Sequence, residues 1–280
     1  MHNEIDLKAA INAISDVIQN RPRPIREFDQ IYMKAGDMVM QSEFVASWAN
    51  GRKLAFLGDG DAVSVCVAYL RAREIIGYGP SEIKVFDFDE RIVGAVNRFA
   101  EREGLTALSA TLYNCIDPFE SVGEFDCFYT NPPWGASNGG ASVNAFVQRG
   151  IESINYEGHG LVVIADDPGL KWPKVVLSNV QKYAAERGFY VSRMAPELHS
   201  YHLDDNPTLK SCNLVLSSVP GNEDRSASSV KLVSAERLKN FYGRSAEPRV
   251  RYVKEKSRVD YGKAHDSEYA FVGFEEENNV

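Results

Sequence analysis

Short apolar runs alternate with amphipathic stretches through most of the chain. Each run has the length of a strand, and the stretches between runs repeat their apolar positions at helical spacing. The expected strands are 53–57, 83–88, 108–113, 125–130, 160–165, 189–194 and 212–217. The expected helices between them are 62–76, 91–103, 143–154 and 173–187. This alternation predicts an α/β fold with a Rossmann-like, doubly wound, mostly parallel seven-stranded sheet.

The ends of this pattern divide the chain into three parts. A long loop, 199–209, joins the last two runs and predicts a closing hairpin with an antiparallel last strand. A short N-terminal helix is expected over 5–18, capped by Asn3 and ended by the prolines of RPRPIREFDQ, and another over 38–48. The charged sequence after the sheet has a weak helical pattern near 235–242. The expected parts are an N-terminal helix and linker, 1–35, a main domain, 36–220, and a charged, partly ordered C-terminal extension, 221–280.

Composition and charge narrow the class of protein. The 280 residues are 44% hydrophobic and carry a net charge of −8, which repels polyanions and disfavours a nucleic-acid substrate, although 231–263 is rich in Lys and Arg. No apolar run reaches the roughly 18 to 20 residues that span a bilayer, and the start MHNEIDLKAA does not resemble a secretory signal. We expect a soluble, cytoplasmic protein with no membrane contact, and the sequence leaves a homodimer open.

The four cysteines have no spacing typical of a metal site. They lie far apart, mostly within apolar strand or helix patterns. They are Cys66, Cys115, Cys127 and Cys212. We therefore expect reduced core thiols and no bound metal.

The first strand ends in a glycine-rich turn, LAFLGDGDA. Gly58 and Gly60 let the backbone approach a ligand, and ligands of open α/β sheets bind beyond the carboxyl ends of the strands. We expect Asp59 to shape a nucleotide pocket and Asp61 to bind or deprotonate an amine. Helix capping by both acids is the alternative interpretation.

Acidic residues also follow the second and third strands. Asp87 and Asp89 in IKVFDFDE are placed to bond ribose hydroxyls; we favour Asp89, with the other acid capping the next helix. The first turn lacks the GxGxxG series, so a pyrophosphate site is not evident. In NCIDPF, Asp117 is placed to bond an adenine amino group beside Ile116, or else initiates a turn as Asp-Pro.

The fourth strand leads directly into FDCFYTNPPWGASNGG. Pro132 and Pro133 stiffen the loop, Asn131 can accept from a substrate amino group, and Trp134 offers a stacking face. This order is expected to hold a nitrogen lone pair toward an electrophilic sulfonium carbon. Pro133 is assigned to substrate contact and the other three to catalysis.

A polar cluster precedes the last strand. Acids there could hold a polyamine, and solvated loop residues are the alternative interpretation. The cluster is Glu197, His199, Tyr201, His202, Asp204 and Asp205. We assign His199 and Tyr201 to substrate binding, together with Asp166 at the exit of the fifth strand, where Asp167 is a similar case.

The Asn-Pro-Pro-aromatic motif resembles that of S-adenosylmethionine-dependent amino-methyltransferases. Over 28–216 the chain resembles the branched-chain polyamine synthases, or bis-aminopropyl spermidine synthases. The matching features are FDQIYM, LAFLGDGDAVSV, VFDFDERIVGAV and FVQRGIESI. This resemblance implies a class I methyltransferase-like fold and aminopropyl transfer from decarboxylated S-adenosylmethionine to a polyamine nitrogen.

The sequence departs from that family in ways that bear on the reaction. Gly60 and Asn131 each stand where the family has Asp, and 1–35 stands in place of a winged-helix domain. A protonated alkylamine needs a carboxylate to take its proton, whereas a neutral aryl amine or amide needs acceptors such as Asn131. The retained acids lead us to favour aminopropyl transfer to a small-molecule amine. The alternatives are S-adenosylmethionine-dependent N-methylation of a base, amide or small molecule, and an inactive nucleotide-binding scaffold.

Overall fold

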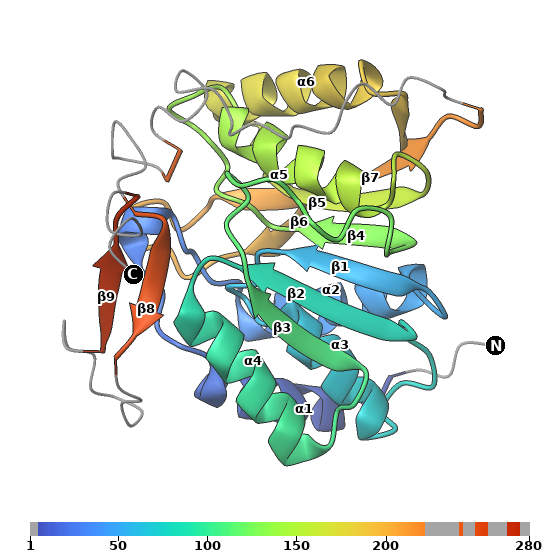
Figure 1. The fold of residues 1–280 in the computed structure, drawn as a ribbon, viewed down its shortest axis with the longest axis vertical. Helices are drawn as coiled ribbons and strands as arrows, with labels where there is room; N and C mark the ends of the chain where they lie inside the picture. Colours follow the sequence, from blue (N-terminus) through green and yellow to red (C-terminus); the bar gives the residue numbers. More distant parts are fainter. Residues whose placement is uncertain (1–4, 222–240, 243–249, 257–267, 275–280) are drawn as a thin grey trace.

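The computed structural model describes residues 5–221, 241–242, 250–256 and 268–274. Its centre is a seven-stranded sheet in the order β3-β2-β1-β4-β5-β7-β6 (Figure 1). The strands are β1 Lys53–Leu57, β2 Glu82–Asp87, β3 Leu108–Leu112, β4 Cys127–Thr130, β5 His159–Ala165, β6 Phe189–Ser200 and β7 Lys210–Ser218. Neighbours from β3 to β5 are parallel, and β7 runs antiparallel to both β5 and β6. The predicted mostly parallel sheet with an antiparallel last strand is confirmed.

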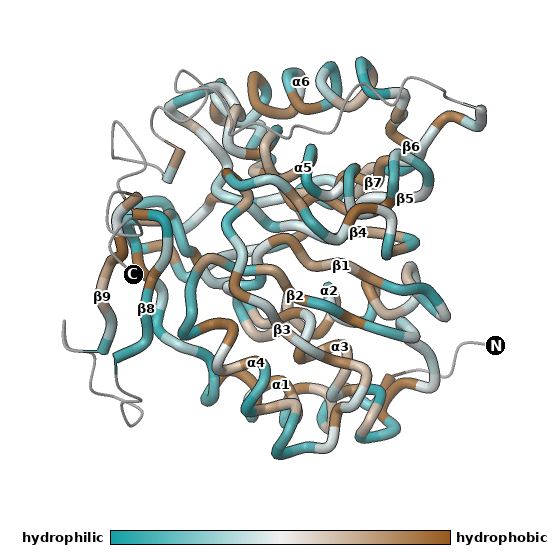
Figure 2. Tube along the Cα trace, in the orientation of Figure 1, coloured by the Kyte–Doolittle hydropathy of each residue, from teal (hydrophilic) through white to brown (hydrophobic). Residues whose placement is uncertain are grey.

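Helices cover both faces of the sheet. Helices α1 to α4 pack into one hydrophobic core, and α5 and α6 pack into another on the opposite face (Figure 1). The helices are α1 Leu7–Asn20, α2 Ala35–Trp48, α3 Val63–Ala72, α4 Glu90–Glu103, α5 Ala141–Ser153 and α6 Lys171–Ala185. Figure 2 shows a hydrophobic stretch along β1, which lies between these two layers. The doubly wound arrangement therefore follows the predicted alternation.

Two boundaries differ from the expected ones. The side chain of Asp6 caps α1 by accepting from Ala9 N at 3.0 Å, whereas Asn3 lies outside the described residues. Strand β6 continues to Ser200 through two register irregularities, so His199 belongs to the strand and not to a loop. An irregularity of this kind interrupts the alternation of inward- and outward-facing residues, so the sequence pattern does not reveal the full length of the strand.

Two short strands follow the sheet in the C-terminal part of the chain. Strands β8 Tyr252–Glu255 and β9 Tyr269–Val272 form a separate antiparallel pair beside α4 (Figure 1). The Arg98 guanidinium on α4 pairs with both carboxylate oxygens of Glu255, at 2.9 and 3.0 Å. The sequence pattern did not predict these strands, and the helix expected near 235–242 lies outside the described residues except for its last two positions.

All four cysteines are buried and free, which confirms them as core thiols. Within the described ranges, no helix is both long enough and apolar enough to cross a membrane.

Candidate active site at the carboxyl edge of the sheet

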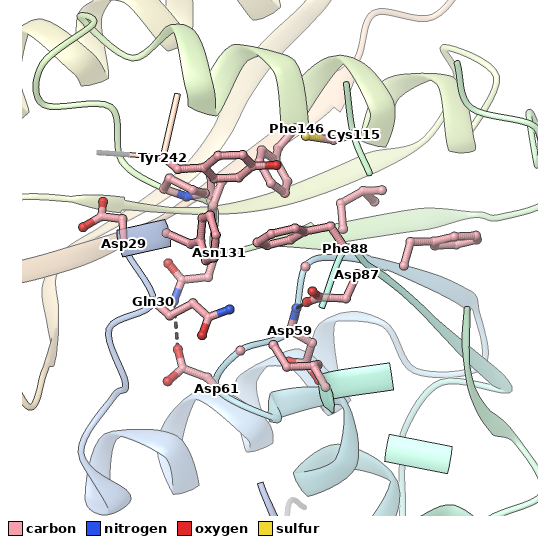
Figure 3. Close-up of a pocket in the computed structure, with 18 of the residues that line it drawn as sticks. Asp29, Gln30, Asp59, Asp61, Asp87, Phe88, Cys115, Asn131, Phe146 and Tyr242 are labelled. Atoms are coloured by element: carbon pink, nitrogen blue, oxygen red, sulfur yellow. Dashed lines mark hydrogen bonds between the residues drawn. The ribbon is translucent and has the colours of Figure 1, made fainter. Parts of the chain in front are cut away.

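A cleft with about 890 Å³ of empty space, counting the open solvent at its mouth, lies at the carboxyl ends of β1, β2, β3 and β4. Its walls come from the turns after these strands, the segment 28–32 and Tyr242. Figure 3 shows Asp59, Asp61, Asp87 and Asn131 gathered within it. Ligands of open α/β sheets bind at this edge, so the cleft is the candidate functional site.

Asp59 caps α3 while lining the cleft. Its Oδ1 accepts from Val63 N at 2.9 Å, and its Oδ2 accepts a short hydrogen bond from the Ser64 hydroxyl. Burial raises the pKa of Asp59 well above its ordinary value. The preceding Gly58 has φ of +77°, and a Cβ there would lie 3.4 Å from the Phe146 ring. The turn therefore needs glycine, and the capping interpretation of Asp59 is compatible with a place in the pocket.

Asp61 is held by groups from three separate segments. Its Oδ1 accepts from Met33 N at 2.6 Å, and its Oδ2 accepts from Asn131 Nδ2 at 2.9 Å (Figure 3). The Arg21 guanidinium lies 3.9 Å from Oδ1 and also donates to the Asp61 carbonyl. Burial raises the pKa of Asp61, and Arg21 opposes that rise. A carboxylate with a raised pKa is a stronger proton acceptor.

The Asn-Pro-Pro-Trp motif follows β4 and lies at the cleft. Pro132, Pro133, Asn131 and Trp134 all line the cleft. Trp134 Nε1 donates to Asn131 Oδ1 at 3.2 Å, and the indole packs edge-on against Tyr201 at 5.0 Å. The amide of Asn131 is therefore oriented by a donor on one side and an acceptor on the other.

Asp89, which we favoured for the ribose, caps the helix, whereas Asp87 lines the cleft. Asp87 lines the cleft and accepts from the backbone N–H groups of Asp59 and Asp89, at 3.0 and 2.9 Å. Burial raises its pKa to about 7. Asp89 is fully buried, caps α4 and pairs with the Arg91 guanidinium, and it also takes a hydrogen bond from Gln30 Nε2. Asp89 is thus engaged by the neighbouring arginine, and of the two acids Asp87 is the one that lines the cleft.

Asp117 does not reach the cleft either. Its Oδ2 accepts from Nε and Nη2 of Arg251, at 3.2 and 3.1 Å, in the C-terminal part of the chain. Asn114 and Cys115 line the cleft in its place. The buried Arg149 guanidinium fixes this turn by donating to the Cys115 carbonyl at 2.8 Å. Sequence reasoning missed Asn114, although it follows the end of β3 by two residues.

The residues assigned to substrate binding near the last strands lie outside the cleft lining. His199 is buried between Ser211 and Gln41, and burial lowers its pKa to about 4. Tyr201 bonds Ser211 through its hydroxyl, at 2.7 Å. Asp166 Oδ2 accepts from Glu197 N at 3.0 Å. Among these, Tyr201 influences the site by packing on Trp134.

An aromatic wall was missed because it comes from the linker and the C-terminal part. Tyr242 stacks on Phe88 at 5.0 Å, and Phe28 packs edge-on against both rings at 5.2 Å. All three residues line the cleft, and Figure 3 shows the labelled Phe88 and Tyr242 on the same side of it. Aromatic side chains at a cleft offer flat faces to a purine. Their identity was visible in the sequence, but their convergence was not.

A sheet of this order with a cleft at its carboxyl edge defines a class I S-adenosylmethionine-dependent methyltransferase-like fold. A putative RNA methyltransferase from Pyrococcus horikoshii shares it with a TM-score of 0.52 at 15% identity, covering 76% of this chain and 100% of that one. Residues 9–273 match the branched-chain polyamine synthase A C-terminal domain family, and the chain belongs to this family.

Several named relatives are similar to this chain. The N(4)-bis(aminopropyl)spermidine synthase of Thermus thermophilus is 27% identical over 190 residues, which is 65% of this chain and 50% of the relative. The N(4)-bis(aminopropyl)spermidine synthase of Thermococcus kodakarensis is 26% identical over 160 residues, which is 55% of this chain and 42% of the relative. The chain thus spans half or less of these curated relatives. The branched-chain polyamine synthase of Thermus thermophilus, solved with N4-aminopropylspermidine and 5'-methylthioadenosine, has a TM-score of 0.63 at 23% identity, covering 75% of this chain and 63% of that one.

Proposed function

We propose that this protein transfers an aminopropyl group from decarboxylated S-adenosylmethionine to a nitrogen of a polyamine. The main support for this proposal is the acidic character of the residues that line the cleft. Among the described residues that line it are the acids Asp29, Asp59, Asp61 and Asp87, and there is no Lys, Arg or His. Intact S-adenosylmethionine brings a carboxylate that this lining would repel, whereas the decarboxylated donor and a polyamine bring only positive groups.

The family relationship supports the same reaction. The Thermus and Thermococcus relatives are named for adding aminopropyl groups to spermidine, and the solved Thermus enzyme holds 5'-methylthioadenosine, the nucleoside such a transfer leaves behind. In this chain, Asp87 and the aromatic wall of Phe28, Phe88 and Tyr242 offer a ribose acceptor and a stacking surface for that nucleoside.

The chemistry needs one proton transfer and one displacement. Asp61 takes a proton from the ammonium group of the acceptor, which frees a lone pair on nitrogen. The nitrogen attacks the aminopropyl carbon bound to the sulfonium, a C–N bond forms, the C–S bond breaks and neutral 5'-methylthioadenosine leaves. The product amine carries the positive charge that the sulfur loses. Asn131 keeps Asp61 aimed through its 2.9 Å hydrogen bond, so catalysis is largely positioning.

Methyl transfer to a neutral amine is the second candidate, favoured by the Asn-Pro-Pro-aromatic motif. In that reaction Asn131 Oδ1 would accept from the substrate amino group. Here the oxygen already accepts from Trp134 Nε1 and the amide nitrogen donates to Asp61. Asn131 is therefore better placed to orient Asp61 than to receive a substrate.

Titration calorimetry with the two donors tests the proposal. We expect clear preference for decarboxylated S-adenosylmethionine over the intact donor, and mass spectrometry should then show spermidine gaining aminopropyl groups. Preference for the intact donor together with a methylated product would replace the proposal with N-methylation. Binding of neither donor nor 5'-methylthioadenosine would favour an inactive scaffold.

A further inference from the structure

The hydroxyl of Tyr129 is a buried polar group without a hydrogen-bond partner in the described part of the protein. Tyr129 is 1% exposed, lies on β4 and lines the cleft. Leaving a buried hydroxyl unpaired is unfavourable, and native proteins rarely do so without a reason. The group is therefore a candidate for pairing with a ligand.

Packing alone does not explain a tyrosine at this position. The ring contacts Phe56 on the neighbouring strand, with centroids 4.6 Å apart, and phenylalanine would make the same contact. Alternate residues of a strand face the same side, so Tyr129 and Asn131 point toward the same layer. The aromatic ring of Tyr129 thus accounts for its packing in the hydrophobic core, and the hydroxyl contributes nothing to that packing.

The polar neighbour on α2 is already engaged. The side chain of Gln41 interacts with Tyr129 and lowers the pKa of the phenol, and the Gln41 amide nitrogen donates one of its two N–H groups to Asn213 Oδ1 at 2.9 Å. Its amide oxygen faces Asn213 Nδ2 and His199 Nε2, both at 2.8 Å. These contacts hold Gln41 in place, and no side chain in the described part of the protein lies at hydrogen-bonding geometry to the phenol oxygen of Tyr129, a residue that lines the cleft.

We propose that Tyr129 is an acceptor-binding residue whose hydroxyl oxygen takes a hydrogen bond from the polyamine nitrogen that is alkylated. This inference rests on the proposed function and adds a residue that sequence reasoning did not single out. The nitrogen would lie between Tyr129 and Asp61: Asp61 takes one proton, and Tyr129 holds the remaining N–H so that the lone pair points at the sulfonium carbon. Burial, followed by the charge of Asp61, raises the pKa of Tyr129 well above its ordinary value, which keeps the phenol neutral.

The substitution Tyr129→Phe tests this role, because it removes the hydroxyl and keeps the ring. We expect KM for spermidine to rise about tenfold, as for the loss of one hydrogen bond to a charged group, with the affinity for 5'-methylthioadenosine unchanged. The melting temperature of the ligand-free protein should stay equal or rise, since no existing hydrogen bond is lost. The matched control is Tyr183→Phe, whose buried hydroxyl donates to Gln148 at 2.8 Å outside the cleft. It should lower the melting temperature and leave KM unchanged.

The outcomes separate this inference from the proposed function. If the unmodified protein transfers aminopropyl groups and Tyr129→Phe has the same KM for spermidine, the role of Tyr129 is overturned and the proposed function stands. A lowered melting temperature in Tyr129→Phe with unchanged KM would assign the hydroxyl to folding. Failure of the unmodified protein to aminopropylate spermidine would overturn the proposed function, and this inference with it.

Discussion

Asn131 Nδ2 donates a hydrogen bond to Asp61 Oδ2 at 2.9 Å and so joins the exits of β4 and β1. The polyamine synthases that this sequence resembles have a second carboxylate at the position of Asn131. An amide there can donate, which favours the ionised form of Asp61 and opposes the rise in its pKa caused by burial. In the proposed reaction, the pair supplies one proton acceptor in a fixed orientation.

Removing the Asn131 side chain should stop turnover without emptying the nucleoside site. In Asn131→Ala, the Asp61 carboxylate loses its hydrogen bond from Asn131 and keeps the one from Met33 N, and Trp134 Nε1 loses its hydrogen-bond acceptor. Because Asp61 is then less well oriented, we expect kcat to fall about 100-fold. Affinity for 5'-methylthioadenosine, measured by calorimetry, should change less than about twofold. The control Asn97→Ala alters an exposed asparagine bonded to Ala110. Lost nucleoside affinity with normal kcat would contradict this assignment.

Restoring the carboxylate should shift the pH dependence. In Asn131→Asp, two carboxylates face each other at hydrogen-bond distance, and repulsion between like charges strongly raises one of the two pKa values of the pair, the one at which both carboxylates become ionised. We expect the acidic limb of the kcat/KM profile to move to higher pH by about one unit, measured with spermidine as acceptor. An unshifted profile would mean that the two groups are too well solvated to interact.

The strands of this fold were predictable because apolar runs and their helical intervals are local signals. Strand β1 was predicted at its observed bounds, 53–57. The failures have nonlocal causes. Strand β6 is extended by pairing with β7 across irregularities, and β8 and β9 are short strands that depend on each other and on contacts with α4.

The sequence was sufficient to predict many of the residues that line the cleft, but not what each of them does there. The turn at Gly58 and the Asn131 motif line the cleft as expected, because strand exits meet at one edge of a parallel sheet. Whether Asp87 or Asp89 faces the ligand depends on Arg91, which draws one of them into an ion pair. Tyr242 reaches the cleft through tertiary packing that no local pattern encodes.

The pair Asp87→Asn and Asp89→Asn separates ribose binding from folding. Asp87→Asn should weaken 5'-methylthioadenosine binding about tenfold, because a charged acceptor in the cleft is lost. Asp89→Asn should leave that affinity within about twofold but lower the unfolding free energy by about 3 kcal/mol, since Arg91 stays buried without its full counter-charge. Urea unfolding and calorimetry measure the two effects. The reverse pattern would restore Asp89 as the ribose ligand.

The buried carboxylates predict how stability depends on pH. Burial raises the pKa of Asp59, Asp61 and Asp87, the last from 3.8 to about 7. Between these values the folded protein binds more protons than the unfolded chain, so stability falls as pH rises through the window. The melting temperature of the ligand-free protein should therefore fall between pH 6.5 and pH 8, above the range in which the lowered pKa of His199 acts in the opposite direction. A smaller decline in Asp87→Asn would identify one source, and a rise with pH would contradict the raised pKa values.

The same charges predict proton release on binding. A polyamine cation favours the ionised form of Asp61 and its neighbours, so joint binding of spermidine and 5'-methylthioadenosine should expel protons between pH 5 and 7. Calorimetric heats should then differ between buffers of different ionisation enthalpy. Equal heats in phosphate and Tris would show that the carboxylates are already ionised before the cation enters.

Tyr242 provides the test of whether the C-terminal part belongs to the nucleoside site. Its ring stacks on Phe88 and its hydroxyl donates to Asn114 Oδ1 at 3.3 Å. Tyr242→Ala removes one wall of the cleft, and we expect 5'-methylthioadenosine affinity to fall about tenfold, whereas Tyr242→Phe keeps the stacking face and should lose about threefold or less. Calorimetry on both variants distinguishes the ring from the hydroxyl. Equal, near-normal affinities would place the nucleoside elsewhere in the cleft, away from the aromatic wall.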